Sequence, residues 1–439
     1  MSTDWMEAAV LLENRFVTEW KGAGKKVVGY TCSYLPDEVF HAAGILPYRL
    51  RGYGAEECSI GDTYFGPFIC SLPKCMLQLA GEGRLRFLDG AIITPGCDSM
   101  RRLDECWRKA GEDYAGIVPP FFFHFAVPHK LADYTLRWFA GEIRRLISAV
   151  EEHFHVAVSD ARLAQAIGVY NRGRALMREL DGLRTMPNPP LTGTEALAVI
   201  LAGTAMARDV YNAELASWIE EARQRTARCG NRMRVMLVGS ANDDVELVRL
   251  IEGDRALVVA DNLCFSSRFH LDPVSEEGDP VEALAQAYLR KNECPRMYGQ
   301  YDARLALLRE KIASARVEGV ILQNIRFCDL HGAENGLFER HLEADGITCM
   351  RVEREYGPLV EKGRLRIRVD AFLERIARKR GATAREATAR EAVTRAVGAR
   401  EATVPGVAAE GAGAEGEGTP GTTGQGVAAP GAGGRGVRT

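Results

Sequence analysis

The sequence has no apolar run near the roughly 18 residues of a membrane span and no strong excess of charge. Its 439 residues include 56 Lys and Arg against 59 Asp and Glu, a formal net charge of −3. So balanced a chain creates no global field that would attract nucleic acid or an anionic membrane surface. The segment 1–7 also lacks the basic region and apolar core of a secretory signal. We therefore expect a cytoplasmic protein with no nucleic-acid or membrane partner.

Local motifs for metal and phosphate binding are also missing. No Cys-x-x-Cys pair occurs, so structural zinc and ferredoxin-type sites have no support. Cys70 and Cys75 are spaced more widely than a zinc hook and have no matching histidine nearby. The segment 239–243, Gly-Ser-Ala-Asn-Asp, is neither a dinucleotide fingerprint nor a Walker loop, so this chain is not expected to bind ATP itself. His129 and His331 are more typical of loop or capping residues than of acid–base groups.

Cysteine, in contrast, is plentiful, with eleven residues. In a cytoplasmic chain these thiols stay reduced, which argues against a disulfide framework. They are then buried thiols, metal ligands or nucleophiles. A lone cysteine beside an apolar strand is more often a small buried hydrophobic residue than a ligand.

The pattern of apolar segments predicts an α/β fold with two Rossmann-like parallel-sheet domains. Strand-like residues 26–32 are followed by helix-like residues 36–44, and strand-like residues 88–94 by helix-like residues 99–107. Four more strands, with helix-like sequence between them, are expected at 234–239, 256–261, 317–323 and 347–353.

These elements predict a division into four parts. Residues 1–127 form an N-terminal α/β domain and residues 128–230 a helical region, since their apolar residues recur every three to four positions. Residues 231–381 form a second α/β domain, with a last helix near 368–379. Residues 382–439, rich in Gly, Ala and Pro, are expected to be a disordered tail with some helix before Pro405.

Two cysteines follow strands in similar surroundings. Cys97 lies in Pro-Gly-Cys-Asp and Cys328 in Arg-Phe-Cys-Asp, each just beyond a strand and before a helix. That edge of an open α/β sheet is where ligands bind. The aspartates Asp98 and Asp329 are expected to cap the helices, whose amide-rich starts would stabilise a thiolate. Cys70 lies in an aromatic loop that could approach the same crevice.

Ordered motifs over about residues 25–378 resemble the 2-hydroxyacyl-CoA dehydratase subunits, a family that includes subunits of ATP-dependent benzoyl-CoA reductase. The motifs are the segments 29–38, 42–44, 61–70, 88–90, 97–98, 171–174, 261–264, 319–321, 327–329, 363–368 and 371–374. The resemblance implies a [4Fe–4S] cluster held by Cys70, Cys97 and Cys328, with one iron open to substrate oxygen. It also implies an oxygen-sensitive, anaerobic enzyme.

The reaction implied is the loss of water from a 2-hydroxyacyl-CoA through a ketyl radical. The implied partners are a homologous second subunit, which makes a heterodimer, and an ATP-dependent iron–sulfur activator that delivers the electron. The acyl-CoA is the substrate.

The dehydratase mechanism needs a base, and Glu38 is our candidate. The alternative is that Glu38, in the first turn of a helix, stabilises the helix dipole.

Three further possibilities stay open. The chain could belong to a benzoyl-CoA reductase, in which the electrons stay in the aromatic ring. It could instead relay electrons to a partner that binds substrate. Cys264 and Cys294 also match positions of double-cubane proteins, but the third such cysteine has no counterpart in residues 81–86. We therefore expect one cubane.

Overall fold

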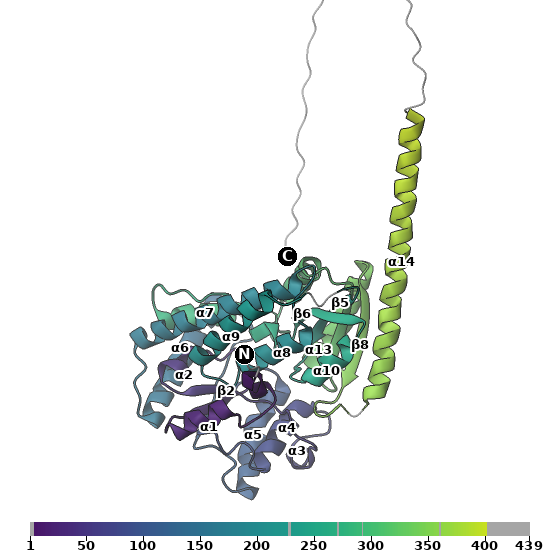
Figure 1. Cartoon of the computed structure of the whole chain (residues 1–439). Helices are drawn as coiled ribbons and strands as arrows, with labels where there is room; N and C mark the ends of the chain where they lie inside the picture. Colours follow the sequence, from purple (N-terminus) through teal and green to yellow (C-terminus); the bar gives the residue numbers. More distant parts are fainter. Residues whose placement is uncertain (1–3, 227–229, 270–271, 292, 360, 402–439) are drawn as a thin grey trace, which may run out of the picture. The chain divides into compact units, whose positions relative to one another are not determined.

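The structure is a computed structural model that describes residues 4–226, 230–269, 272–291, 293–359 and 361–401. The chain divides into two units, residues 1–381 and residues 382–439. The first unit contains both sheets; Figure 1 shows the N-terminal elements in purple and the second sheet in teal and green.

The first sheet has four parallel strands in the order β2-β1-β3-β4. They are β1 (Val27–Tyr30), β2 (Leu46–Arg49), β3 (Gly90–Ile93) and β4 (Phe121–His124). The first three are buried along their whole length, as expected for a parallel sheet covered on both faces. Pro47 lies in β2 at the edge of the sheet, where a missing N–H is tolerated.

The second sheet repeats this arrangement in the order β6-β5-β7-β8. Its strands are β5 (Met233–Gly239), β6 (Ala256–Asn262), β7 (Gly319–Ile325) and β8 (Thr348–Arg354). The first three of these are also buried throughout. β5 ends at Gly239, whose φ of 140° and close approach to the backbone of Gln323 exclude a side chain.

Helices cover the sheets and link them. The helices of the N-terminal part are η1 (Asp4–Ala9), α1 (Arg15–Gly22), α2 (Glu38–Ala42), α3 (Ser59–Tyr64), α4 (Ser71–Gly81) and α5 (Asp98–Asp113). The region between the sheets consists of α6 (Asp133–Phe154), α7 (Asp160–Thr185), α8 (Gly193–Ala202) and α9 (Arg208–Arg223). The remaining ones are α10 (Val245–Glu252), η2 (Ser267–Phe269), α11 (Pro280–Leu289), α12 (Tyr301–Ser314), α13 (Asp329–Ala344) and α14 (Lys362–Glu401).

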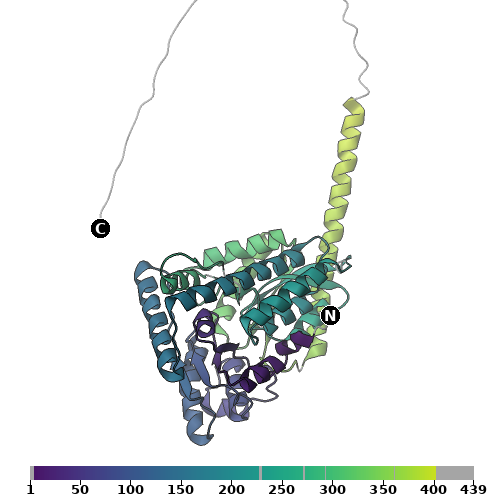
Figure 2. The ribbon, with the colours of Figure 1, turned by 60° about the vertical axis from the view of Figure 1, so that its left-hand side comes forward.

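The region of four helices contacts elements on both sides. α7 packs against α2 and α9, and α6 packs against α11 from the second half of the chain. α8 is buried almost all round and contacts α10 and β6. Figure 2 shows these long helices in blue and teal. The first part of α14 packs Phe372 and Ile376 over Gly319 of β7.

In each sheet the chain order reverses beside the first strand, between β1 and β3 and again between β5 and β7. Loops at the carboxyl ends of such strand pairs form the usual ligand crevice of an open α/β sheet. Cys32 and Cys97 lie on the loops of the first pair, and Cys328 follows β7 in the second pair. The fold therefore brings cysteine-bearing loops to both crevices.

The α/β prediction, with two parallel sheets and helices between them, is confirmed. Residues 382–401 of the predicted tail continue α14 as a helix, since Ala, Arg and Glu are strong helix formers. The rest of that prediction, for residues 402–439, lies outside the described residues. Within the described part, no helix is long and apolar enough to cross a membrane.

Candidate functional site

Cys70, Cys97 and Cys328 line one cavity of about 370 Å³, which we call the thiol cavity. Its remaining wall consists of Pro95, Gly96, Asp98, Ser99, Arg101, His129, Asp329 and Leu330. Cys70 is buried, whereas Cys97 and Cys328 are partly exposed. Three cysteines from segments far apart in sequence thus share one cavity between the two halves of the first unit.

Each of the three cysteines directly precedes a helix. Cys70 is the N-cap of α4, Cys97 of α5 and Cys328 of α13. Unpaired amides and the positive end of the helix dipole favour negative charge at such positions. Asp98 and Asp329 are the first helical residues, so the prediction that they cap these helices is wrong by one residue.

The loops of Cys70 and Cys328 also contact each other through aromatic rings. Phe68 and Phe327 meet edge to face with centroids 5.7 Å apart. Phe327 has a φ of 63°, a left-handed conformation that is a genuine outlier for a bulky side chain. Strained residues of this kind concentrate at functional sites, and this one fixes the backbone direction directly before Cys328.

Burial raises the pKa of all three thiols. The pKa of Cys97 lies well above its usual value because of burial and the nearby Cys70, with the Met100 amide acting in the opposite direction. Burial, and then Cys70, raise the pKa of Cys328 to about 12. Burial also raises the pKa of Cys70, against a hydrogen bond with Ser99. Cys70 therefore raises the pKa of both other thiols. Binding of a cationic iron group would release the protons of the thiols.

The donor set fits an iron–sulfur cluster better than a single ion. Soft thiolates are the ligands of iron–sulfur clusters and zinc. A tetrahedral zinc ion, with Zn–S of about 2.3 Å, needs its ligands gathered around one point. Among the described residues no three His, Cys, Asp or Glu side chains form such a group. Three thiols that line one cavity of about 370 Å³ are of the ligand type that holds the irons of an iron–sulfur cluster.

A buried cation lies close to Cys328. Arg268 donates to the backbone oxygen and side-chain oxygen of Asn262, and its Nη1 lies 3.1 Å from His331 Nε2. Burial and Arg268 hold the pKa of His331 well below its usual value, so its neutral ring accepts this hydrogen bond. Arg268 in turn lowers the pKa of Cys328. The guanidinium therefore favours negative charge at the thiol cavity.

Three other cysteines lie near the thiol cavity. A Cβ atom at Gly96 would lie 3.5 Å from Cys32 Sγ. Burial raises the pKa of Cys294, and Cys264 and Cys32 act in the same direction. Arg49 Nη2 is 3.6 Å from Cys264 Sγ. The second cluster considered at Cys264 and Cys294 stays a hypothesis.

Glu38 does not line the thiol cavity. It is fully buried, and its Oε1 accepts from Arg174 at 2.5 Å while its Oε2 accepts from Tyr288 at 2.8 Å. These contacts join α2 to α7 and α11. Both oxygens of the predicted base are therefore already engaged by protein groups.

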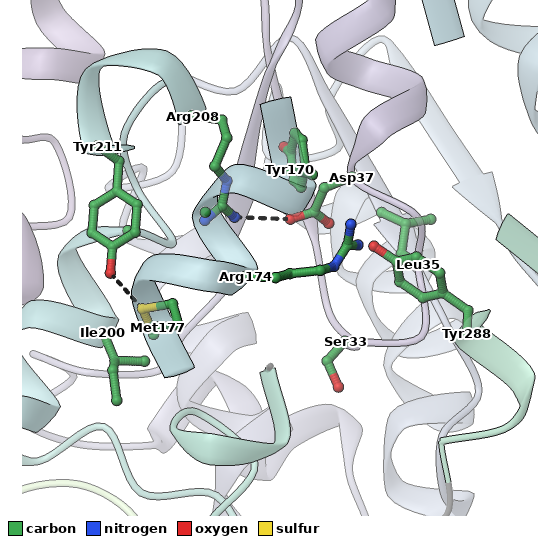
Figure 3. Close-up of a pocket in the computed structure, with 12 residues that line it drawn as sticks. Ser33, Leu35, Asp37, Tyr170, Arg174, Met177, Ile200, Arg208, Tyr211 and Tyr288 are labelled. Atoms are coloured by element: carbon green, nitrogen blue, oxygen red, sulfur yellow. Dashed lines mark hydrogen bonds and ion pairs between the residues drawn. The ribbon is translucent and has the colours of Figure 1, made fainter. Parts of the chain in front are cut away.

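A small cavity of about 30 Å³, lined by both polar and apolar side chains, adjoins this ion pair (Figure 3). Figure 3 shows Arg208 reaching toward Asp37, at 3.9 Å. Asp37 also accepts from Tyr30 at 2.9 Å. Burial raises the pKa of Asp37 to about 6, although Arg208 opposes the shift. A volume of this size holds about one water molecule, so the cavity is too small for an organic substrate.

Sequence reasoning missed several of these residues. Ser99 and Arg101 lie in the helix-like segment 99–107 directly after the motif 97–98, and Arg174 lies in the motif 171–174, so all three carried a usable signal. Arg268 and Tyr288 carried no such signal in the sequence, because only long-range packing brings Arg268 to His331 and Tyr288 to Glu38. His129, expected to be a loop residue, lines the thiol cavity with its Nδ1 3.1 Å from the backbone oxygen of Arg296.

Residues 32–376 match the family model described as 2-hydroxyglutaryl-CoA dehydratase, D-component. A benzoyl-CoA reductase subunit from Thauera aromatica is 28% identical over 337 residues, 74% of this chain and 84% of the relative. The beta subunit of lactoyl-CoA dehydratase from Anaerotignum propionicum is 24% identical, over 75% of this chain and 86% of the relative. The beta subunit of (R)-2-hydroxyglutaryl-CoA dehydratase from Acidaminococcus fermentans is 23% identical, over 76% of this chain and 89% of the relative.

Proposed function

This chain belongs to the family of the 2-hydroxyglutaryl-CoA dehydratase D-component, and from that premise we propose that it is the iron–sulfur subunit of a 2-hydroxyacyl-CoA dehydratase. The observation that carries the proposal is the convergence of Cys70, Cys97 and Cys328 on one cavity. The three residues lie on different segments of both halves, and each begins a helix. A purely structural role would not require that arrangement.

The reaction we propose removes water from a 2-hydroxyacyl-CoA. The β-hydrogen of this substrate is weakly acidic, so direct elimination is slow. One electron from a separate ATP-driven activator would convert the thioester carbonyl to a ketyl radical, which expels the hydroxyl group and acidifies that hydrogen. The electron is afterwards returned. The absence of a phosphate-binding motif in the sequence supports a separate activator.

Cys70, Cys97 and Cys328 are the residues that would hold the [4Fe–4S] cluster. When bound, this group supplies one-electron chemistry and an iron with a coordination position not taken by protein. The starts of α4, α5 and α13 stabilise the three thiolates, and Arg268 adds a fixed positive charge near Cys328.

Polar side chains at the thiol cavity are suited to orient a substrate. Arg101 is exposed and paired with Asp98 at 2.9 Å, an exposed contact that an anionic ligand can replace at little cost. Burial and Arg296 lower the pKa of His129, against backbone hydrogen bonds with Arg296 and Pro95, so a substrate would have to replace one of these two contacts. We propose both residues as substrate contacts.

Glu38 remains our candidate base for the dehydratase reaction. To accept a proton it must first exchange its contact with Arg174 or Tyr288. The same contacts give direct support to a positioning role, in which Glu38 holds α2 against α7. Substitutions of Glu38 and Tyr288 with different expected effects on turnover separate the two roles.

A second candidate function is the reduction of an aromatic acyl-CoA. The 28% identical relative is named as a benzoyl-CoA reductase subunit, whereas the two dehydratase subunits compared above are 23–24% identical. In either branch a homologous second subunit is the proposed partner, because each relative is named as a subunit. A relay role would leave substrate binding to that partner.

Anaerobic reconstitution tests the proposal. The chain is purified with a homologous subunit and a cluster-bearing activator, and its iron, sulfide and turnover are measured with 2-hydroxyacyl-CoA and aromatic acyl-CoA thioesters. We expect a brown protein that dehydrates at least one 2-hydroxyacyl-CoA. Cys97→Ser should lose most of the iron of this subunit, whereas Cys106→Ser, on the same helix, should retain it. Full iron and turnover in Cys97→Ser would refute the ligand assignment; reduction of aromatic thioesters alone would select the second function.

A further inference from the structure

A pair of cysteines away from the thiol cavity lies closer together than ordinary neighbours do. The Sγ atoms of Cys58 and Cys75 are 3.0 Å apart. A covalent S–S bond of about 2.05 Å is only about 1 Å shorter. Cys58 immediately precedes α3, and Cys75 lies within α4, which packs against α3. Small side-chain adjustments would therefore bring the two sulfurs to bonding distance.

We propose that Cys58 and Cys75 form a reversible dithiol–disulfide pair, a modification site that reacts with low-molecular-weight disulfides such as oxidised glutathione. The pair is separate from the thiol cavity, since neither residue lines it. It goes beyond the proposed enzymatic function and does not depend on it.

The two thiols are suited to different roles in this chemistry. Cys58 is partly exposed, so a small disulfide reaches it, while Cys75 is 1% exposed. The hydrogen bond with Cys75 lowers the pKa of Cys58; burial and Asp62 oppose this shift, and the nearby Lys74 supports it. The pKa of Cys75 is raised by the same hydrogen bond and by burial. Cys58 is therefore the attacking thiol and Cys75 the resolving one.

The exchange balances in two steps. The Cys58 thiolate attacks one sulfur of the small disulfide, forming a mixed disulfide and releasing one small thiolate. The Cys75 thiol then loses its proton and attacks Cys58 Sγ, which forms the Cys58–Cys75 bond and releases the second small thiol. The protein loses two electrons and two protons, and the small disulfide gains them.

The position of the pair gives the reaction a consequence. The segment 58–75 contains α3, the aromatic loop and Cys70, so the disulfide closes a loop that carries the first proposed cluster ligand. Cys75 Sγ also lies 3.8 Å from the backbone oxygen of Tyr356, in the second half of the unit. The oxidised form has no thiol proton for this hydrogen bond, so oxidation cross-links the two ends of the Cys70 segment and at the same time removes the contact of Cys75 with Tyr356.

Peptide mapping tests the proposal. The full chain is equilibrated anaerobically with a series of oxidised-to-reduced glutathione ratios, quenched with acid, alkylated with N-ethylmaleimide and digested with trypsin and Asp-N. These cuts separate Cys58, in peptide 52–61, from Cys70, in peptide 62–74. We expect a cross-link between peptides 52–61 and 75–84 that rises with the ratio and disappears with dithiothreitol.

Matched variants decide the outcome. Cys58→Ser should abolish the cross-link, while Cys106→Ser, which removes another partly exposed thiol, should leave it unchanged. In Cys75→Ser, Cys58 should accumulate as the glutathione mixed disulfide, which also shows that this variant is folded and reactive. Reduced Cys58 and Cys75 at every ratio, or pairing of Cys58 with Cys70 or Cys106, would overturn the proposal. None of these readouts depends on a cluster or on turnover.

Discussion

Arg268 Nη1 lies 3.1 Å from His331 Nε2, so a buried guanidinium is held beside the residue that lies one helical turn after Cys328. His331 is neutral and Arg268 also donates to Asn262, which leaves the positive charge without a carboxylate in these contacts. The charge therefore acts on the nearby thiols. It lowers the pKa of Cys328 and of Cys294.

Replacing Arg268 by Met should make Cys328 less acidic. Loss of a nearby cation removes a factor that favours the thiolate, so in cluster-free protein the alkylation of Cys328 at pH 8.5 should slow about threefold to tenfold. Mass spectrometry of iodoacetamide-treated protein over time measures the rate. In reconstituted protein, the midpoint potential of the cluster should fall, because reduction adds negative charge.

Arg101→Met is the matched control for this experiment. Arg101 also lines the thiol cavity, but it is exposed and paired with Asp98, and solvent screens its charge. We expect unchanged alkylation of Cys328 in this variant. An equal effect of both substitutions would contradict a specific role of Arg268.

Glu38→Gln should destabilise the fold whatever the reaction. The substitution leaves the buried guanidinium of Arg174 without its carboxylate, which costs about 3 to 5 kcal/mol. Tyr288→Phe removes one hydrogen bond to the same carboxylate and should cost about 1 kcal/mol. Urea unfolding measures both. A loss below about 1 kcal/mol for Glu38→Gln would show that the ion pair is not maintained in solution.

The base role of Glu38 requires a separate measurement. Under conditions where both variants are folded, a true base would make Glu38→Gln lose at least about a hundredfold in turnover while Tyr288→Phe keeps most of its activity. A positioning role would instead lower the activities of both variants by a smaller factor, because each substitution weakens the contacts that hold α2. The pH–rate profiles add a second criterion, because only loss of the base removes the acidic limb.

The raised pKa of Asp37, about 6, gives stability a specific pH dependence. Because the folded-state pKa is above the usual 3.8, the folded state binds this proton more tightly than the unfolded chain. The contribution is fully present below pH 3.8 and is lost as the pH rises through 6. A rise in pKa from 3.8 to about 6 corresponds to about 3 kcal/mol. Asp37→Asn should remove this component.

Urea unfolding of wild type and Asp37→Asn at about pH 4.5 and about pH 7 isolates the component. Other titrating groups are common to both proteins and cancel in the difference. The free energy of unfolding of the wild type should fall by about 2 kcal/mol relative to the variant between these pH values. Parallel pH dependence of the two proteins would contradict the raised pKa.

The sequence predicted six of the eight strands in the described residues, and two of the three thiols, for the same reason, but it missed β2 and β4. β3 and the first part of β7 are apolar runs, and a cysteine in the loop after such a strand lies at the ligand edge of the sheet. Cys70 could not be placed physically, because it follows an irregular loop; only the resemblance selected it. The Arg268–His331 contact and the Cys58–Cys75 pair depend on how separate elements pack, which periodicity does not encode.

Gly239 tests whether the end of β5 is as closely packed as the structure indicates. A Cβ atom there would lie 1.7 Å from the backbone oxygen of Gln323, and φ is 140°, so Gly239→Ala must displace β7 or the following loop. We expect a loss of more than about 3 kcal/mol in the free energy of unfolding.

Gly141→Ala is the control: this residue of α6 has open space around its Cβ position, so alanine should stabilise the protein by up to about 1 kcal/mol. Thermal and urea unfolding compare the two variants, and similar effects of both would mean that β5 and β7 do not approach each other this closely. Because β7 leads directly to Cys328, Gly239→Ala should also lower the iron content after reconstitution, whereas Gly141→Ala should not.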